Sequence, residues 1–395
     1  MRIAILFDNL GPYHLARLKA AAAAGMTVIA IETRGQSREY AWDKVETGTV
    51  LDRVTLVPHN EQDPGKREIG KRLTDLLARR APDVIAIPGW SDHVGLTALR
   101  WARGAKVPVI VMSESNRDDG RRVWTREMVK RILLSLCAAG LAGGRRAAAY
   151  LEALGMPADR IATGYDVIDN AYFAAGADAA RRTPDLRQSL ALPDRYFLCC
   201  ARFIAKKNLP FLIDAYARYH VETLAAGAQP WGLVIAGDGE ERPAVEARIA
   251  AHGLGEAVTL AGFVQYDGLP KYYGLAGAFV LASTTEQWGL VVNEAMASGL
   301  PVLVSNRCGS AADLVKDGVN GLTFDPADEG ALAARMKQIA EGDGQAMGSE
   351  SARIIADWAP ERFGASIATL ARLVVDRPDD RKSVVALTTL DMLIQ

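Results

Sequence analysis

Two glutamates, Glu286 and Glu294, stand eight positions apart in the stretch STTEQWGLVVNEAMASGLPVLVS, residues 283–305. The stretch predicts an exit loop after a strand and then a helix over 290–298, so that Glu294 lies about one turn inside the helix. Two carboxyl groups can act as the acid and base of a glycosidase. A carboxylate near a helix N-terminus, however, is stabilised as the anion and is a poor general acid. Because an ionised carboxylate only accepts hydrogen bonds, it suits the gripping of paired hydroxyl groups. We therefore expect both glutamates to hold a ligand rather than to cleave one.

A second stretch, CARFIAKKNLPFLIDAY, supplies positive charge. Arg202 and Lys207 follow an apolar run and precede a helical pattern, so they fall in a strand-to-helix loop. An arginine fork and a lysine point charge in such a loop suit a diphosphate. A solvated surface loop is the plainer reading of this pair taken alone.

Two further stretches are weaker. VIAGDGEE places Gly237 and Gly239 at a strand exit, where they form either part of a binding loop or a plain turn. LAGFVQYDGLPKYYGLA places Val264 in a loop with the character of a base-contacting segment, and core packing explains that loop equally well.

The elements around these loops alternate between short apolar runs and longer helical patterns. Because the runs are apolar throughout, they predict parallel strands that are buried on both faces. The runs are Arg2–Phe7, Thr27–Glu32, Val54–Val57, Asp83–Pro88, Pro108–Met112 and Ala139–Ala142, and then Tyr196–Cys200, Gly232–Ala236, Val258–Ala261, Ala278–Ala282, Pro301–Val304 and Gly321–Phe324. The fold class is therefore α/β, with two Rossmann-like doubly wound domains. Ligands of such sheets bind outside the carboxyl ends of the strands.

The expected domains are residues 1–180 on the acceptor side and residues 181–375 on the donor side. They meet near Arg181–Pro193, where prolines flank the segment RRTPDLRQSLALP. Residues 376–395 form a tail that we expect to pack back on the first domain.

Bulk composition narrows the class of protein. The 395 residues are 49% hydrophobic and carry a net charge of −1, which disfavours a nucleic-acid binder with a broad basic field. The four cysteines show no metal-type spacing and no disulfide framework, which fits a reducing compartment. The N-terminus lacks the features of a signal peptide, and no apolar run is long enough to span a membrane. We expect a cytoplasmic protein, with peripheral membrane contact left open.

Taken together, these stretches resemble the group 1 (family 4) retaining nucleotide-sugar glycosyltransferases of the GT-B type. The resemblance covers residues 196–330 closely and the first domain loosely. Its most specific part is the E-x7-E spacing of Glu286 and Glu294 followed by EAMASGLPVLVS. The order Arg202 to Lys207, Gly237 to Gly239, and then E-x7-E also matches the family.

The resemblance implies roles for the matching positions. Arg202 and Lys207 would neutralise the departing diphosphate, and Glu286 would hold donor-sugar hydroxyls. Glu294 would grip the ribose diol. The remaining donor-side positions would present backbone: Gly289 in the turn, the amides of Leu290 and Val291 to the phosphates, and Val264 to the base.

The resemblance also implies the reaction. A sugar would pass from a nucleotide-diphosphate donor to a hydroxyl acceptor with retention, and no cofactor or metal would be needed. The sequence contains no Asp-x-Asp, a common metal-holding pattern beside diphosphates. Two alternatives stay open: a nucleotide-sugar 2-epimerase of similar architecture, and a non-catalytic nucleotide-sugar-binding protein. A dinucleotide dehydrogenase is disfavoured because NLGPYH lacks G-x-G-x-x-G.

Candidate residues of the first domain lie in its strand-exit loops. Gly11 and His14 follow the first apolar run, His93 lies in GWSDHVG, and Glu114 falls near a position where relatives often carry histidine. All four are candidates for the acceptor side or for the loops of the first domain, and His14 could touch the acceptor or the diphosphate. Helix capping or surface exposure is an equally good reading of His14.

One basic segment invites a further hypothesis. In RRVWTREMVKRILLSLC, Arg122, Arg126 and Lys130 are spaced at four-residue intervals beside a stripe that includes Trp124 and Met128. An ordinary amphipathic helix explains this spacing. The alternative is a peripheral membrane contact, since basic amphipathic helices bind anionic lipid.

Overall fold

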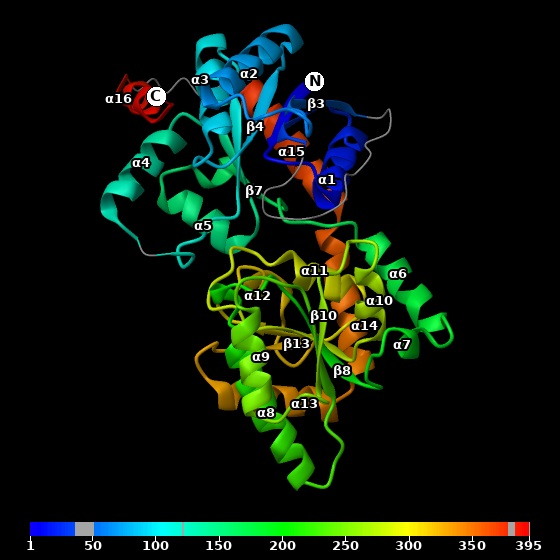
Figure 1. Ribbon diagram of the computed structural model, residues 1–395. Coiled ribbons are helices and arrows are strands. Elements are labelled where there is room, and N and C mark those ends of the chain that lie inside the picture. Colours follow the sequence, from blue (N-terminus) through cyan, green and yellow to red (C-terminus); the bar gives the residue numbers. More distant parts are fainter. Residues whose placement is uncertain (36–50, 121, 378–383, 395) are drawn as a thin grey trace. The chain divides into compact units, whose positions relative to one another are not determined.

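The computed structural model describes residues 1–35, 51–120, 122–377 and 384–394 (Figure 1). The chain forms two compact units: unit 1 is Met1–Ile168 with Pro360–Gln395, and unit 2 is Asp169–Ala359. The units do not coincide with the expected ranges 1–180 and 181–375. Helix α6 (Asn170–Arg182) packs against helices of unit 2, whereas α15 (Pro360–Asp376) packs against the first helix of unit 1. Within the expected tail, residues 376–395, residues 378–383 and 395 lie outside the described residues.

Unit 1 is built on a seven-stranded parallel sheet in the order β3-β2-β1-β4-β5-β6-β7. Its strands are β1 (Arg2–Phe7), β2 (Thr27–Arg34), β3 (Asp52–Val57), β4 (Val84–Pro88), β5 (Val109–Ser113), β6 (Ala139–Ala142) and β7 (Ile161–Thr163). Its helices are α1 (Pro12–Ala23), α2 (Lys66–Arg80), α3 (His93–Ala105), α4 (Trp124–Leu134), α5 (Arg145–Ala153), α15 and α16 (Val384–Ile394).

Unit 2 is built on a six-stranded parallel sheet in the order β10-β9-β8-β11-β12-β13. Its strands are β8 (Tyr196–Cys200), β9 (Gly232–Ala236), β10 (Val258–Gly262), β11 (Ala278–Leu281), β12 (Val302–Ser305) and β13 (Gly321–Phe324). Its helices are α6, α7 (Leu186–Ser189), α8 (Leu209–Ala225), α9 (Arg242–Ala251), α10 (Leu269–Leu275), α11 (Leu290–Ala297), α12 (Ala311–Leu314), α13 (Glu329–Glu341) and α14 (Gly344–Ile355).

Strand order reverses once in each sheet. The reversal falls between β1 and β4 in unit 1 and between β8 and β11 in unit 2. Loops that leave such neighbouring strands diverge to opposite faces of the sheet, so their carboxyl ends flank a crevice. In unit 2 this point lies between the Arg202 loop and the Glu286 loop.

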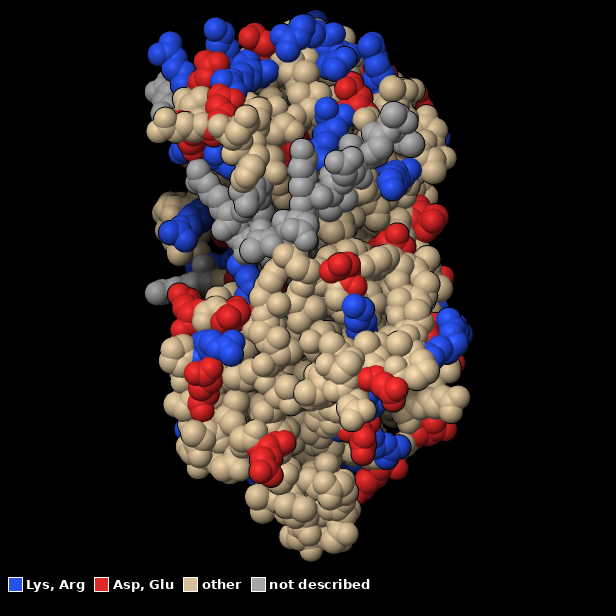
Figure 2. All heavy atoms as spheres, turned by 45° about the vertical axis from the view of Figure 1, so that its right-hand side comes forward, with Lys and Arg blue, Asp and Glu red and all other residues tan. Residues whose placement is uncertain are grey.

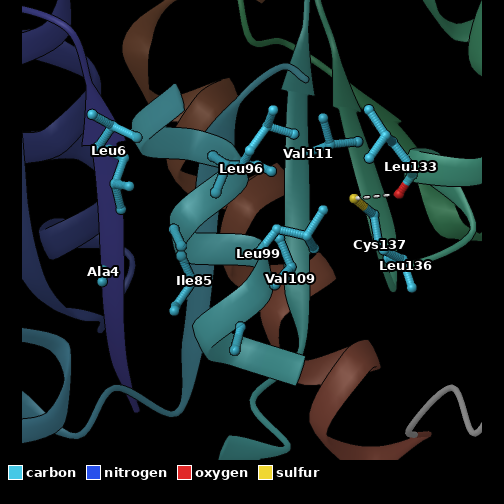
Figure 3. Packing of buried hydrophobic residues seen from close by; sticks show 14 of the residues in the cluster. Ala4, Leu6, Ile85, Leu96, Leu99, Val109, Val111, Leu133, Leu136 and Cys137 are labelled. Atoms are coloured by element: carbon cyan, nitrogen blue, oxygen red, sulfur yellow. Dashed lines mark hydrogen bonds between the residues drawn. The ribbon is translucent and has the colours of Figure 1, made fainter. Parts of the chain in front are cut away.

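Apolar packing fixes the strand positions in unit 1. Figure 3 shows Leu96 and Leu99 of α3 packed over Ile85 of β4 and over Val109 and Val111 of β5. All five side chains are buried. Full burial of one such side chain contributes about 1.5–3 kcal/mol, so the sheet is a rigid support for the loops at its edge.

Charged side chains are spread unevenly. On the face in Figure 2, Lys and Arg gather on unit 1, whereas both signs are scattered among uncharged residues on unit 2. Helix α2, KREIGKRLTDLLARR, has more basic than acidic residues. The net charge of −1 therefore conceals a local excess of positive charge. Among the described residues, no helix combines the length and the apolar character needed to cross a bilayer.

Candidate active site

The two loops at the strand reversal of unit 2 are joined to each other. After β8 the chain turns through a short 3-10 helix, Ala205–Lys207, and after β11 it runs to the start of α11. The amide of Thr284 in the second loop donates to the carbonyl oxygen of Lys206 in the first, at 2.9 Å. This backbone bond fixes the side chains of one loop against those of the other.

Glu286 lies at the centre of this junction. Its carboxylate forms ion pairs with Lys207 and with Lys206, whose Nζ is 3.3 Å from Oε1. Ser283 Oγ lies 3.4 Å from Oε2. The side chains of Glu286 and Lys207 are each 11% exposed. The structure thus brings two predicted site residues together, and it adds Lys206, which sequence reasoning missed although it is the neighbour of Lys207.

The protonation of Glu286 follows from these neighbours. Burial alone would raise the pKa of Glu286, but the charges of Lys207 and Lys206 and their hydrogen bonds outweigh burial and lower it. The carboxylate is therefore ionised at neutral pH. It can accept hydrogen bonds from hydroxyl groups and cannot serve as a general acid.

Gly289 makes the turn from loop to helix. Its φ of +96° lies in the left-handed region, which side chains rarely adopt, and α11 starts at the next residue. The predicted tight turn at Gly289 is confirmed. Leu290 and Val291 are the first residues of α11, and the first amides of a helix have no acceptor within it. These amides suit an anion.

Glu294 lies one turn farther along α11 and is completely buried. The hydroxyl of Tyr273 donates to its Oε2 at 2.8 Å, and Tyr273 also hydrogen-bonds Cys200 at the end of β8. A neutral hydroxyl, that of Tyr273, thus donates to the carboxylate of Glu294, whereas Glu286 pairs with two lysines. A ribose can reach Glu294 only if atoms that cover it move.

Gly237 and Gly239 have a structural explanation. A Cβ at Gly237 would lie 1.8 Å from the carbonyl oxygen of Ala201, and one at Gly239 would lie 2.6 Å from that of Phe203. Both glycines have positive φ. They let the loop after β9 lie directly against the loop that carries Arg202, which is half-buried there.

Val264 is the remaining donor-side prediction. It is half-buried in the loop after β10, close to Gly268, where an added Cβ would lie 2.9 Å from Val264 Cγ1. The loop leaves the same edge of the sheet as the others, as parallel strands require.

In unit 1, His14 caps its own helix. It is the third residue of α1, and its Nδ1 accepts a hydrogen bond from the amide of Gly11 at 3.1 Å. Burial, with a smaller contribution from Arg17, lowers the pKa of His14 to about 3. The imidazole is therefore neutral at physiological pH. The structure therefore agrees with the helix-capping interpretation of His14, with Gly11 as its partner.

His93 also has a structural contact. It is the first residue of α3, and its Nε2 lies 3.1 Å from the carbonyl oxygen of Lys66, the first residue of α2. Asp92 caps the helix by accepting from the amide of Gly95. His93 thus joins the starts of two helices, and it lies on a different loop from His14.

Glu114 belongs to a buried polar cluster that the sequence did not reveal. It follows β5 and hydrogen-bonds the side chain of Asp166. Burial raises the pKa of Asp166 well above its usual range, and the charge of Glu114 adds to this increase. The charge of Arg17 lowers the pKa but does not cancel the increase. Arg17 Nε donates to the carbonyl oxygen of Val167 at 3.1 Å, and its guanidinium lies over the ring of Tyr165. Of the unit 1 predictions, Glu114 belongs to this cluster, and His14 is affected by the charge of its Arg17.

The three basic residues of the proposed membrane contact are not equivalent. Arg122 precedes α4 rather than lying on it, and it donates to the hydroxyl of Tyr150 at 2.9 Å. Lys130 also donates to this hydroxyl and pairs with Glu127. The expected cationic row of Arg122, Arg126 and Lys130 is therefore incorrect, and of the three only Arg126 is exposed.

The loops at the strand reversal of unit 2 thus carry two ammonium groups and an ionised carboxylate, and a helix begins directly after the second loop. Ammonium groups and helix N-termini suit an anion, and an ionised carboxylate suits hydroxyl groups. In the described part of the chain, no group of three or more His, Cys, Asp and Glu side chains is arranged to hold a metal ion.

Comparison with known proteins identifies two family matches. Residues 183–356 match the family described as "Glycosyl transferases group 1", and residues 11–163 match the "Glycosyl transferase 4-like domain". The chain is 34% identical over 151 residues to an alpha-D-kanosaminyltransferase of Streptomyces kanamyceticus, which is 38% of each chain. It is 30% identical over 221 residues to a GDP-mannose-dependent phosphatidylinositol monomannoside mannosyltransferase of Mycobacterium tuberculosis, which is 51% of this chain and 55% of that one. The matches thus span about half or less of these relatives.

Solved structures match over almost the whole chain. A sucrose-phosphate synthase of Thermosynechococcus elongatus is similar with a TM-score of 0.73 at 19% identity, over 95% of this chain and 99% of that one. The Anabaena protein HepE in complex with UDP is similar with a TM-score of 0.70 at 18% identity, over 94% of this chain and 100% of that one. At these identities the likeness shows the fold, which is GT-B. The family is shown by the two family matches, over residues 183–356 and 11–163: this chain belongs to the group 1 glycosyltransferases.

Proposed function

We propose that this protein is a metal-independent retaining glycosyltransferase that moves a sugar from a nucleotide-diphosphate donor to a hydroxyl acceptor. The observation that carries the proposal is the junction of Glu286 with Lys206 and Lys207 at the strand reversal of unit 2. It combines positive charge for a diphosphate with an ionised carboxylate for sugar hydroxyls. A similar fold in Anabaena has been solved with UDP-glucose, which supports a nucleotide-sugar donor.

In this proposal each group of unit 2 has one task. Lys207 and Arg202 stabilise the negative charge that grows on the leaving diphosphate, which is the largest benefit such a site can give. The amides of Leu290 and Val291 bind phosphate oxygens, since a helix N-terminus favours anions. Glu286 accepts hydrogen bonds from the donor sugar, and Glu294 from the ribose.

Retention follows if the acceptor hydroxyl attacks from the face that the diphosphate leaves. The leaving phosphate oxygen then takes the proton of the acceptor, and the new bond forms on the same face of the sugar. The ionised state of Glu286 supports this proposal, because no carboxylic acid is needed. Catalysis is then positioning and charge stabilisation.

Donor screening and product analysis test the proposal. Nucleotide-diphosphate sugars are ranked by thermal shift, and the products formed with candidate acceptors are identified by mass spectrometry and by NMR of the new anomeric centre. A glycoside of retained configuration is expected. An epimerised free nucleotide sugar, or binding without turnover on every acceptor, would favour the epimerase or the binding protein instead.

Calorimetry tests which part of the donor each glutamate binds. Glu286→Ala should weaken binding of the intact donor and leave the free nucleotide diphosphate nearly unaffected. Glu294→Ala should weaken both ligands, because both contain the ribose. Equal losses for Glu286→Ala on the two ligands would remove its assignment to the sugar.

A further inference from the structure

The outer face of α4 exposes large apolar side chains. Trp124 is 75% exposed, Met128 is 50% exposed and Val123, directly before the helix, is 37% exposed. Trp124 and Met128 are one turn apart and so share a face. Later residues of the helix, Val129, Ile132 and Leu133, pack into or against the core of unit 1, whereas Trp124 and Met128 do not. Burial within the unit therefore does not explain why the outer face is apolar.

The charged residues next to this face are either paired with one another or exposed. Glu127 is the acidic residue of α4, and it is bound by Arg122, Lys130 and the hydroxyl of Tyr150. This network uses two cations and leaves no uncompensated negative charge on the helix. Arg126 lies between Trp124 and Met128 in the sequence and is exposed. No ion pair connects it to any residue in the part of the chain that the structure describes.

An exposed indole, a thioether and an isopropyl group beside a cation have the chemistry of the boundary between water and lipid. Tryptophan prefers the headgroup level of a bilayer, and helices of this kind lie in the membrane plane with basic residues toward anionic lipid. A stable protein interface buries about 800 Å² on each partner, which is more than three side chains supply.

We propose that Val123, Trp124 and Met128, the α4 patch, insert into the surface of an anionic membrane while Arg126 contacts lipid headgroups. The proposal concerns a surface of unit 1 and stands independently of the reaction proposed for unit 2. Of the three cations that sequence spacing suggested, Arg126 remains available, because Arg122 and Lys130 bind Tyr150 and Glu127 instead.

Vesicle binding of the full chain tests this docking. Co-sedimentation is measured with phosphatidylcholine vesicles and with vesicles that contain phosphatidylglycerol, each at low and at high salt. Binding to the anionic vesicles that weakens with salt is expected. The Trp124→Ser/Met128→Ser variant should bind about tenfold less or weaker still, since affinity scales with inserted apolar area. Arg126→Glu should also lose binding to anionic vesicles.

The matched control is Val221→Ser/Leu224→Ser on α8, where two apolar side chains are 65% and 50% exposed. It should bind vesicles as the parent does, and all variants should keep the thermal unfolding midpoint of the parent. Equal binding of the α4 variant and the control would overturn the proposal, as would equal binding to both lipid compositions or no binding by the parent. Sedimentation velocity without lipid tests whether the α4 patch is instead a dimer interface. If the parent is a dimer and the α4 variant alone is a monomer, the patch binds a second copy of the chain.

Discussion

The hydroxyl of Tyr273 donates a hydrogen bond to Oε2 of Glu294, and both residues are completely buried. The two oxygens are 2.8 Å apart. A directed hydrogen bond restricts the orientation of the carboxylate that accepts it, so Tyr273 helps to orient Glu294. Tyr273 is thus a positioning residue for the proposed ribose contact.

Replacing Tyr273 with Phe should weaken nucleotide-diphosphate binding by about tenfold, the scale of one hydrogen bond to a charged group. The loss should shrink for a nucleotide that lacks its ribose hydroxyls, because Glu294 then has no ligand to hold. Calorimetry with both nucleotides measures the difference. Tyr196→Phe is the matched control, since the Tyr196 hydroxyl donates to the carbonyl oxygen of Tyr272 rather than to a site residue. Equal losses with both nucleotides would reduce Tyr273 to a packing role.

Lys207→Ala should lower kcat by about 10²–10³, the usual effect of removing one donor that stabilises transition-state charge. Donor affinity should fall less than turnover, because the benefit is greatest as the diphosphate leaves. Arg202→Lys should rescue Arg202→Ala only in part, since the guanidinium fork is lost. Steady-state kinetics on folded variants check this. If kcat stays within a few-fold of the parent for both alanine variants, the charge is stabilised elsewhere.

Glu286 should make stability depend on pH in the acid range. Its folded pKa is lowered below the ordinary 4.5, so the ionised form stabilises the fold. That contribution is present above the unfolded pKa and is lost as pH falls through the folded pKa. The stability gap between the parent and Glu286→Gln should therefore narrow as the pH falls below the unfolded pKa of 4.5 and through the lowered folded pKa. Urea unfolding at several pH values measures the gap. A constant gap would show that Glu286 does not titrate with folding.

Activity should persist in excess chelator. The cations at the junction are side chains, Lys206 and Lys207, and they provide the charge that a bound metal would otherwise give to a diphosphate. The measurement is the initial rate before and after prolonged incubation with chelator. Activity that disappears and returns with magnesium or manganese would contradict the proposed mechanism.

Gly237→Ala should lower both stability and activity. A Cβ there would overlap the carbonyl oxygen of Ala201 and displace the neighbouring Arg202. Gly253→Ala is the matched control, because Gly253 also has positive φ but has open space around its Cβ position. Strain at positive φ costs of order 1–3 kcal/mol in both variants. In Gly237→Ala alone, turnover per folded molecule should also fall. Equal effects would show that backbone strain alone explains both.

Much of the fold follows from local sequence. Every strand except β7 overlaps an expected apolar run, and most of these strands are apolar because they are buried along most of their length. Strand β7 is only three half-exposed residues, Ile161–Thr163, so no such run marks it. The start of α11 was predicted at Leu290 because Gly289 marks the turn.

The site was predicted less completely, for a physical reason. Arg202, Lys206, Lys207 and Glu286 all stand in recognisable loops, although the contact of Lys206 with Glu286 spans 80 residues of chain. Tyr273 lies on α10, and its importance comes from a contact with Glu294 across 21 residues. The cluster of Arg17, Glu114 and Asp166 likewise joins three distant segments. Periodicity describes neighbours along the chain and carries no information about such pairings.

The division of the chain has a consequence for synthesis. Unit 2 is one continuous segment, Asp169–Ala359, whereas unit 1 is completed only by the residues from Pro360 onward. Helix α15 crosses α1 so closely that a Cβ at Gly364 would lie 2.4 Å from the carbonyl oxygen of Ala20. Domains fold as units while the ribosome extends the chain. The half of the protein translated second can therefore finish folding first, and the half translated first waits for its last helices with an apolar surface still uncovered.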